Sequence, residues 1–190
     1  MKKFIKGGMK MERTFYDLTH RQNEIWYMDK MHPNTSIGVI AGVFRMRGIE
    51  KFDVLNKAIN YFVKNNDAMR IMITEENGIP KQYISDFSDF NVEFLDFSEK
   101  SNDCFYRWEQ EQTQVAMNTI EKPLFKFVMI KFPNNEGGFY IKVHHTIADA
   151  WGMTILVNGI ARNYFEIENG TYADKKAPSY VSYIEKERES

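Results

Sequence analysis

The chain has 190 residues, of which 43% are hydrophobic, 15% aromatic and 27% charged. This apolar share supports one compact domain with one core and excludes a disordered chain. The 25 basic and 26 acidic residues leave a formal net charge of -1, so the chain has no basic excess for binding a nucleic-acid backbone or an anionic membrane. The single cysteine, Cys104, excludes an intrachain disulfide and indicates a reducing compartment.

The start of the chain and its longest uncharged run bear on whether the protein is secreted or crosses a membrane. The start, MKKFIKGGMKMERT, has lysines but lacks the apolar region of a secretory signal. The uncharged run 150–161 is much shorter than the roughly 20 apolar residues that cross a membrane. We therefore expect a cytoplasmic protein with no membrane partner, in which residues 1–13 form a flexible tail or an artificial extension.

Hydrophobic periodicity predicts a mixed succession of helices and strands. Thr19 is the expected N-cap of the first helix, and Asn77-Gly78 and the segment 133–138 are expected to form the turns of two hairpins. In chain order, the predicted elements are helix 19–30, strand 37–46, helix 52–64, strands 69–74, 81–84 and 92–97, helix 103–117, strands 124–132 and 139–145, and helix 151–166. Antiparallel hairpins among helices exclude a doubly wound parallel sheet.

The residues best suited to chemistry lie between the last predicted strand and the last predicted helix. His144 and His145 close the strand, and the Asp149 carboxylate follows four residues after His145. Imidazole has the side-chain pKa nearest neutrality, and a loop at a strand end lets a side chain enter a cleft while the sheet holds its backbone. Because neighbouring side chains on a strand point to opposite faces, one histidine should face a cleft and the other should pack inside.

A metal site is the main alternative for this segment, because histidine and aspartate are both metal ligands. The side chains of adjacent strand residues point to opposite faces, however, and the sequence shows no further cluster of metal ligands beside them. We therefore expect acid–base chemistry and no bound metal.

Residues 144–150 resemble the HHxxxDG motif of the chloramphenicol-acetyltransferase-like superfamily. The match is closest to the condensation domains of nonribosomal peptide synthetases. The resemblance extends from about residue 15 to residue 189 and includes further family motifs, whose counterparts here are Leu18-Thr19 with Gln22 and Trp26, the segment 66–70 in place of HExLR, Pro123-Leu124-Phe125, and Trp151.

The resemblance implies an α/β (α+β) two-layer sandwich, with a mixed, largely antiparallel sheet and helices on one side. Residues 14–190 are expected to form a single N-terminal lobe without its C-terminal partner, because family members are longer and contain two similar lobes. Two motifs show departures: Ala150 replaces the glycine of HHxxxDG, and Asn66-Asp67 replaces the HE pair. Alanine keeps the backbone N–H, so we expect the first departure to have a small effect.

The resemblance also implies an activity, the formation of an amide bond between a donor acyl or peptidyl thioester and the amine of an acceptor aminoacyl thioester. Both substrates are expected on the phosphopantetheine arms of carrier proteins, with no tightly bound cofactor. His145 is expected to face the substrate channel as general base or orienting acceptor, and backbone N–H groups near Asp149 and Ala150 to bind the oxyanion. The implied partners are peptidyl or acyl carrier proteins, a C-terminal condensation lobe and neighbouring synthetase domains.

Other residues of the motifs are expected to support the site. In similar proteins the motif aspartate turns away from the substrate and pairs with the arginine of the second motif, which implies an ion pair between Asp149 and Arg70. His144 is expected to pack and hydrogen-bond on the face opposite His145. Ala150 and Trp151 are expected to support the site structurally.

Two other functions stay open on the sequence alone. A stand-alone trimeric acyltransferase that uses coenzyme A has a similar length, although its HHxxxDG motif lies near the C-terminus, whereas 40 residues follow Ala150 here. A non-catalytic lobe that docks carrier proteins is the other alternative, because an isolated lobe lacks half of the channel. The motif also occurs in epimerisation domains and does not distinguish them from condensation domains.

Overall fold

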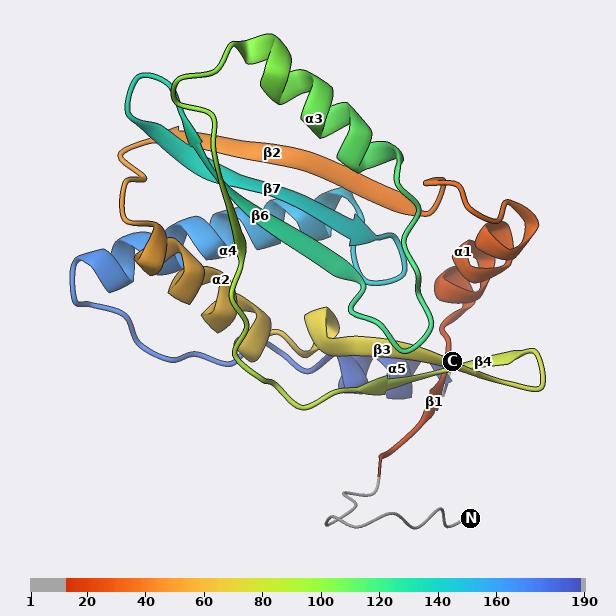
Figure 1. Ribbon diagram of the computed structural model, residues 1–190. Helices are drawn as coiled ribbons and strands as arrows, with labels where there is room; N and C mark the ends of the chain where they lie inside the picture. The colour runs from red at the N-terminus through yellow and green to blue at the C-terminus, as the bar shows by residue number, and fades with distance from the viewer. Residues whose placement is uncertain (1–12, 189–190) are drawn as a thin grey trace, which may run out of the picture.

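Two β-sheets organise the computed structural model, which describes residues 13–188 (Figure 1). The predicted tail, residues 1–13, lies outside the described residues except for Arg13, whose guanidinium lies 4.6 Å from the centre of the Tyr83 ring. In chain order the elements are β1 (Tyr16–Asp17), α1 (His20–Met31), β2 (Val39–Arg47), α2 (Phe52–Asn65), the 3₁₀ turn η1 (Asp67–Arg70), β3 (Ile71–Glu76), β4 (Ile79–Ile84), β5 (Glu93–Asp96), α3 (Asn102–Gln114), β6 (Phe125–Phe132), β7 (Glu136–His144), α4 (Ala150–Glu168) and α5 (Tyr180–Arg188).

The larger sheet has the strand order β2-β7-β6-β5. β7 pairs antiparallel with both of its neighbours, and β5 runs parallel to β6. α2 and α4 cover one face of this sheet, where Leu55 and Ile160 share a buried cluster with Phe139 and Ile141 of β7. The predicted α/β class with a mixed, largely antiparallel sheet is therefore confirmed.

The placement of α3 differs from the expectation that the helices lie on one side. α3 packs on the face of the larger sheet opposite α2 and α4, where Phe105 contacts a cluster that includes Val128, Ile130 and Tyr140 (Figure 1). The reason lies in β6, which carries apolar side chains on both faces of the sheet. Both faces must therefore be covered by other elements. The nearly continuous apolar sequence of β6 therefore indicates a second helical layer.

The smaller sheet has the order β1-β4-β3 and lies next to α1. Thr19 caps α1 as predicted, in a reciprocal capping box with Gln22. The Asn77-Gly78 turn is also confirmed, because both residues have positive φ angles, 54° and 80°, as the tight hairpin between β3 and β4 requires. Trp26 of α1 packs on Ile71 and Ile73 of β3, so α1 is fixed to this sheet.

Three local features differ from the predicted elements. Met69 and Arg70 end η1 and do not begin a strand. Gly137 and Gly138 belong to β7 and not to the turn, because a Cβ atom on Gly138 would lie 1.9 Å from the Phe44 carbonyl oxygen of β2. α5 has no counterpart among the predicted helices, since it buries few apolar side chains, among them Ile184.

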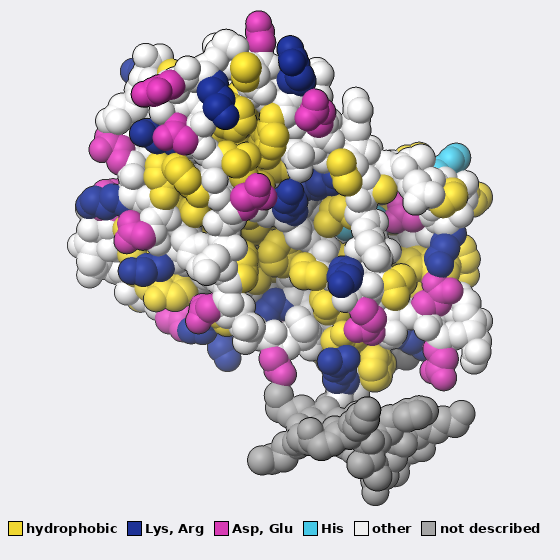
Figure 2. All heavy atoms as spheres, viewed as in Figure 1, with side chains coloured by type: hydrophobic (Ala, Val, Ile, Leu, Met, Phe, Trp, Pro, Cys, Tyr) yellow, Lys and Arg dark blue, Asp and Glu magenta, His cyan; other side chains and the backbone are white. Residues whose placement is uncertain are grey.

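The surface carries no large region of one charge sign on the face shown in Figure 2, where lysine and arginine side chains alternate with aspartate and glutamate among hydrophobic ones. This agrees with the near balance of 25 basic and 26 acidic residues. Within residues 13–188, no helix has the length and apolar character needed to cross a lipid bilayer.

Candidate active site

The two histidines lie at the end of β7, where the backbone is held from both sides. The His144 N–H donates to the Leu124 carbonyl oxygen at 2.8 Å, and the His145 N–H donates to the Gly38 carbonyl oxygen, also at 2.8 Å. Leu124 immediately precedes β6 and Gly38 immediately precedes β2. The hydrogen-bond ladder therefore continues past the strand ends and fixes the backbone of both histidines, whose side chains leave opposite faces of the sheet.

His144 points into the interior and is 2% exposed. Its Nε2 lies 2.6 Å from Oδ2 of Asp29 on α1, and its Nδ1 lies 2.9 Å from the Thr146 hydroxyl oxygen. Both ring nitrogens are thus engaged. This placement agrees with the packing and hydrogen-bonding position predicted for His144, and the imidazole connects α1 to the loop before α4.

His145 is exposed, and its imidazole has no hydrogen-bond partner among residues 13–188. It lies on the sheet face that carries Val143 and Phe125, opposite the face of His144. The predicted division between one buried and one accessible histidine is therefore present. An imidazole with two free nitrogens on a fixed backbone can accept a proton from a substrate group placed beside it.

Asp149 caps α4 and does not pair with Arg70. Its Oδ1 accepts a hydrogen bond of 2.7 Å from the Gly152 N–H, and its side chain is exposed. The predicted ion pair is wrong for this structure because the first turn of α4 offers Asp149 a local partner that needs no long-range contact. Asp149 still orders the loop, since it fixes where α4 begins.

Arg70 holds a different segment, the chain that follows β4. Its Nη1 donates to the Ser85 carbonyl oxygen at 2.6 Å, while the Ser85 N–H and hydroxyl donate to the Arg70 carbonyl oxygen. Its Nε is buried and has no hydrogen-bond partner. Arg70 therefore has one unused donor in an enclosed position.

Ala150 and Trp151 begin α4, directly after the cap. Ala150 does not have a positive φ angle, so this backbone position does not require glycine. The Trp151 side chain is 72% exposed and lines a groove between α2 and α4 together with Tyr61 and Ile155. Trp151 was expected to support the site structurally, but its side chain is not buried in the described residues.

Several residues of the site were not predicted from the sequence. Gln22 donates from its Nε2 to the Thr146 carbonyl oxygen at 3.0 Å and exchanges hydrogen bonds with the buried Gln82 of β4. Asp29 binds His144, and Gly38 leaves space for that contact, since a Cβ atom there would lie 2.3 Å from Asp29 Oδ1. Gln22 belongs to a family motif, whereas no sequence motif marks Asp29 as a residue of the site.

The α3 face of β7 carries a buried lysine two residues before His144. Lys142 Nζ donates to the Gln112 carbonyl oxygen at 2.6 Å and also to that of Val115, at the C-terminal end of α3. A cation suits this end of a helix, where carbonyl groups lack partners. Burial, with a smaller contribution from Lys126, lowers the pKa of Lys142. Lys142 therefore attaches α3 to the strand that carries the histidines.

A metal-binding group is not present among residues 13–188: no three side chains of histidine, cysteine, aspartate or glutamate are placed to hold an ion together. The arrangement at the end of β7 consists of one enclosed histidine and one accessible histidine, followed by a capped helix.

Comparison with known proteins gives a consistent family assignment. Residues 12–190 match the family model of the condensation domain. Surfactin synthase subunit 1 of Bacillus subtilis is 35% identical over 185 residues, and one of the plipastatin synthase subunits of the same organism is 28% identical over 179 residues. The matches cover 94% and 93% of this chain but only 5% and 7% of those proteins.

Solved structures give the same fold. The starter condensation domain of rhizomide synthetase RzmA superposes with a TM-score of 0.84 at 21% identity, over 93% of this chain and 43% of that one. The first condensation domain of the CDA synthetase gives a TM-score of 0.78 at 16% identity, over 86% of this chain and 43% of that one. The chain thus spans less than half of each solved domain.

Proposed function

Because the chain belongs to the condensation-domain family of nonribosomal peptide synthetases, we propose that residues 14–190 form the N-terminal lobe of a condensation domain. The domain forms an amide bond between a donor acyl or peptidyl thioester and the amine of an acceptor aminoacyl thioester. The observation that supports this activity is the accessible imidazole of His145 on a backbone that hydrogen-bonds to the chain before β2.

His145 acts as the general base of this reaction. As the acceptor amine attacks the thioester carbon, a C–N bond forms and the carbonyl oxygen becomes an oxyanion. His145 takes the proton that the amine loses and returns it to the sulfur when the C–S bond breaks. A positioned base of this kind contributes about 10²–10⁴ in rate.

The residues around His145 position it. Asp29 and Thr146 occupy both ring nitrogens of His144, so His144 acts through the backbone that it shares with His145. Asp149 sets the start of α4, and the backbone N–H groups near Asp149 and Ala150 lie where the loop after His145 ends. We assign these N–H groups to the oxyanion, which agrees with the preference of helix N-termini for negative charge.

The proposed partners are peptidyl or acyl carrier proteins, whose phosphopantetheine arms carry both substrates, and a C-terminal condensation lobe that completes the channel. Neighbouring synthetase domains follow from the same assignment, as does a place in the cytoplasm.

The test is His145→Ala in the complete condensation domain, with product measured after both carrier proteins are loaded. We expect amide product to fall by about 10²–10⁴. His20→Ala is the matched control, because His20 is an exposed histidine on α1. Unchanged turnover in His145→Ala would remove the general-base role, and a trimer of the native chain in size-exclusion chromatography would favour a coenzyme A-dependent acyltransferase.

A further inference from the structure

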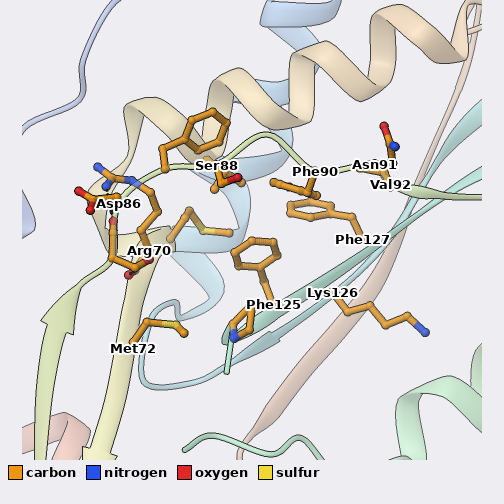
Figure 3. A pocket seen from close by; sticks show the side chains of 15 residues that line it. Arg70, Met72, Asp86, Ser88, Phe90, Asn91, Val92, Phe125, Lys126 and Phe127 are labelled. Atoms are coloured by element: carbon orange, nitrogen blue, oxygen red, sulfur yellow. Dashed lines mark hydrogen bonds between the residues drawn. The ribbon is translucent and has the colours of Figure 1, made fainter. Parts of the chain in front are cut away.

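The turn that carries His145 does not receive the support that was predicted from Arg70. Figure 3 shows Arg70 and Asp86 at the same end of a cavity between α2 and β6. Arg70 Nη1 donates to the Ser85 carbonyl oxygen at 2.6 Å, and Asp149 caps α4 instead of pairing with the guanidinium. Other buried groups therefore hold the chain beside His145.

His145 and Thr146 are the two central residues of a tight turn. The Ile147 N–H donates to the His144 carbonyl oxygen at 3.0 Å, which closes this turn. Thr146 is only 4% exposed, and its carbonyl oxygen accepts a hydrogen bond of 3.0 Å from Gln22 Nε2. The orientation of this peptide group affects where the His145 side chain leaves the backbone, because the two residues share one turn.

The cap of α1 does not explain why residue 22 is an amide. Gln22 Oε1 accepts the Thr19 N–H at 2.9 Å to complete the capping box, and glutamate is equally suited to this position. The amide nitrogen differs, because Gln22 Nε2 donates to the Thr146 carbonyl oxygen and to Gln82 Oε1, each at 3.0 Å. A carboxylate has no donor for either oxygen. The two distant acceptors therefore account for glutamine at this position.

Gln82 completes the hydrogen bonds of this pair from the smaller sheet. It is fully buried on β4, the strand between β1 and β3. Its Nε2 donates to the Asp17 carbonyl oxygen at 2.9 Å and to Gln22 Oε1 at 2.8 Å. Each N–H of the two side-chain amides thus has an acceptor. A buried polar network in which every donor is satisfied is rigid, which an apolar side chain at this position would not provide.

α1 contacts both neighbours of His145. Asp29 Oδ2 lies 2.6 Å from His144 Nε2, while Gln22 binds the Thr146 carbonyl oxygen. Gln22 and Asp29 are seven positions apart, and residues at this spacing lie on one face of a helix. A single helix therefore holds the backbone on each side of the proposed base.

We propose that Gln22 and Gln82 are positioning residues of the proposed base. Their paired amides connect the Asp17 carbonyl of β1 to the Thr146 carbonyl and so hold the turn from which His145 projects. Both side chains are buried, so they act through the backbone and not on the substrate. This inference rests on the proposed function and adds the residues on which the rate of proton transfer depends.

The first test is Gln22→Glu in the complete condensation domain, with both carrier proteins loaded. Glutamate keeps the acceptor for the Thr19 N–H and loses the donors toward Thr146 and Gln82. We expect kcat to fall by about 10–10²-fold, as for a small displacement of a catalytic group, while KM stays within about twofold. Gln110→Glu makes the same change at an exposed position of α3 and should keep the native kcat. An unchanged kcat in Gln22→Glu, or an effect on KM alone, would overturn the proposal.

A second measurement separates positioning from a general loss of stability and needs no substrate. Amide hydrogen exchange of this chain, followed by NMR, reports the His145 N–H on the Gly38 carbonyl and the Ile147 N–H on the His144 carbonyl. In Gln22→Glu these two amides should exchange about tenfold faster or more, while amides in the middle of β6 and β7 keep their native rates. Native rates at residues 145 and 147, or an equal acceleration of all amides, would overturn the proposal.

The contribution of Gln82 is tested by Gln82→Met, which keeps a long unbranched side chain and removes the amide. Gln22→Glu and Gln82→Met should each lower kcat. Because the two amides act as a unit, the double variant should be within about twofold of the more impaired single variant. Losses that multiply in the double variant would refute the coupled pair.

The positioning residues and the base are tested separately. In a His145→Ala background, Gln22→Glu should cause no further loss of kcat, because the group that it positions is absent. A further loss as large as in the native background would refute the positioning role. Unchanged amide product in His145→Ala would refute the proposed function, whereas the exchange rates at residues 145 and 147 report the support of the turn independently of the reaction.

Discussion

Replacing Gly38 with alanine should disrupt the contacts that support the end of β7, the strand that carries His144. A Cβ atom at this position would lie 2.3 Å from Asp29 Oδ1 and 2.6 Å from His144 Nε2. Neither partner has room to yield without breaking the 2.6 Å contact between them, because His144 is buried and its other nitrogen is bound to Thr146. Gly38→Ala should therefore separate α1 from the end of β7.

The magnitude follows from two contributions. Losing a hydrogen bond to a charged group costs about 1.5–3 kcal/mol, and forced repacking costs about 1–3 kcal/mol, which together give about 3–5 kcal/mol. For a chain of this size, each kcal/mol lowers the melting temperature by about 2–4 °C, so we expect a drop of roughly 10 °C. Thermal unfolding followed by circular dichroism measures it directly.

Gly42→Ala is the matched control, since Gly42 lies in the same β2 region and a Cβ atom there would meet nothing within 4 Å. Its melting temperature should match that of the native chain. A double-mutant cycle sharpens the test, because Gly38→Ala should cost much less when Asp29 is already alanine. Equal stability of Gly38→Ala and Gly42→Ala would refute the steric argument.

Three further predictions concern stability. Asp149→Ala should cost about 1 kcal/mol by urea unfolding and Asp149→Asn less, as expected for an N-cap, whereas a loss of about 3–5 kcal/mol would point to a buried ion pair. Gly159→Ala should cost about 1–2 kcal/mol, because its Cβ would lie 2.5 Å from Phe62 Cε2 and the gain in helix propensity offsets only part of the clash; unchanged urea unfolding would contradict this contact. Burial, with the hydrogen bond to Glu121, raises the pKa of Tyr83 from 10.0 to about 12. The unfolded chain releases that proton at lower pH, so stability should fall as pH rises from about 10 to about 12, and Tyr83→Phe should reduce this slope.

Local sequence patterns predicted most of the fold. The capping box at Thr19 and Gln22, the positive φ angles at Asn77-Gly78 and the alternation along β6 and β7 depend on residues close in sequence. The same reasoning divided the two adjacent histidines between opposite faces. Each of these features is set by neighbours within a few positions, which is why a single sequence contains it.

The features that could not be predicted depend on contacts between distant segments. Asp29 and His144 are 115 positions apart, and nothing near Asp29 marks it as a partner of the site. Gly137 and Gly138 were predicted to lie in a turn, because the contacts that require glycine there come from the distant backbone carbonyl groups of Ile49 and Phe44. The predicted Asp149–Arg70 ion pair was wrong because Asp149 caps α4 locally and needs no distant partner.

The contacts of His144 bear on the general-base role proposed for His145, because the two histidines share one stretch of backbone. With Asp29 on Nε2 and Thr146 on Nδ1, His144 has no free nitrogen for a substrate, and Gln22 further holds the Thr146 carbonyl. The same contacts immobilise the backbone that His145 shares, at no cost to the freedom of its own ring. A mutation that releases His144 should therefore lower the rate through the position of His145, and Asp29→Asn should reduce turnover less than Asp29→Ala because an amide oxygen can still accept the hydrogen bond.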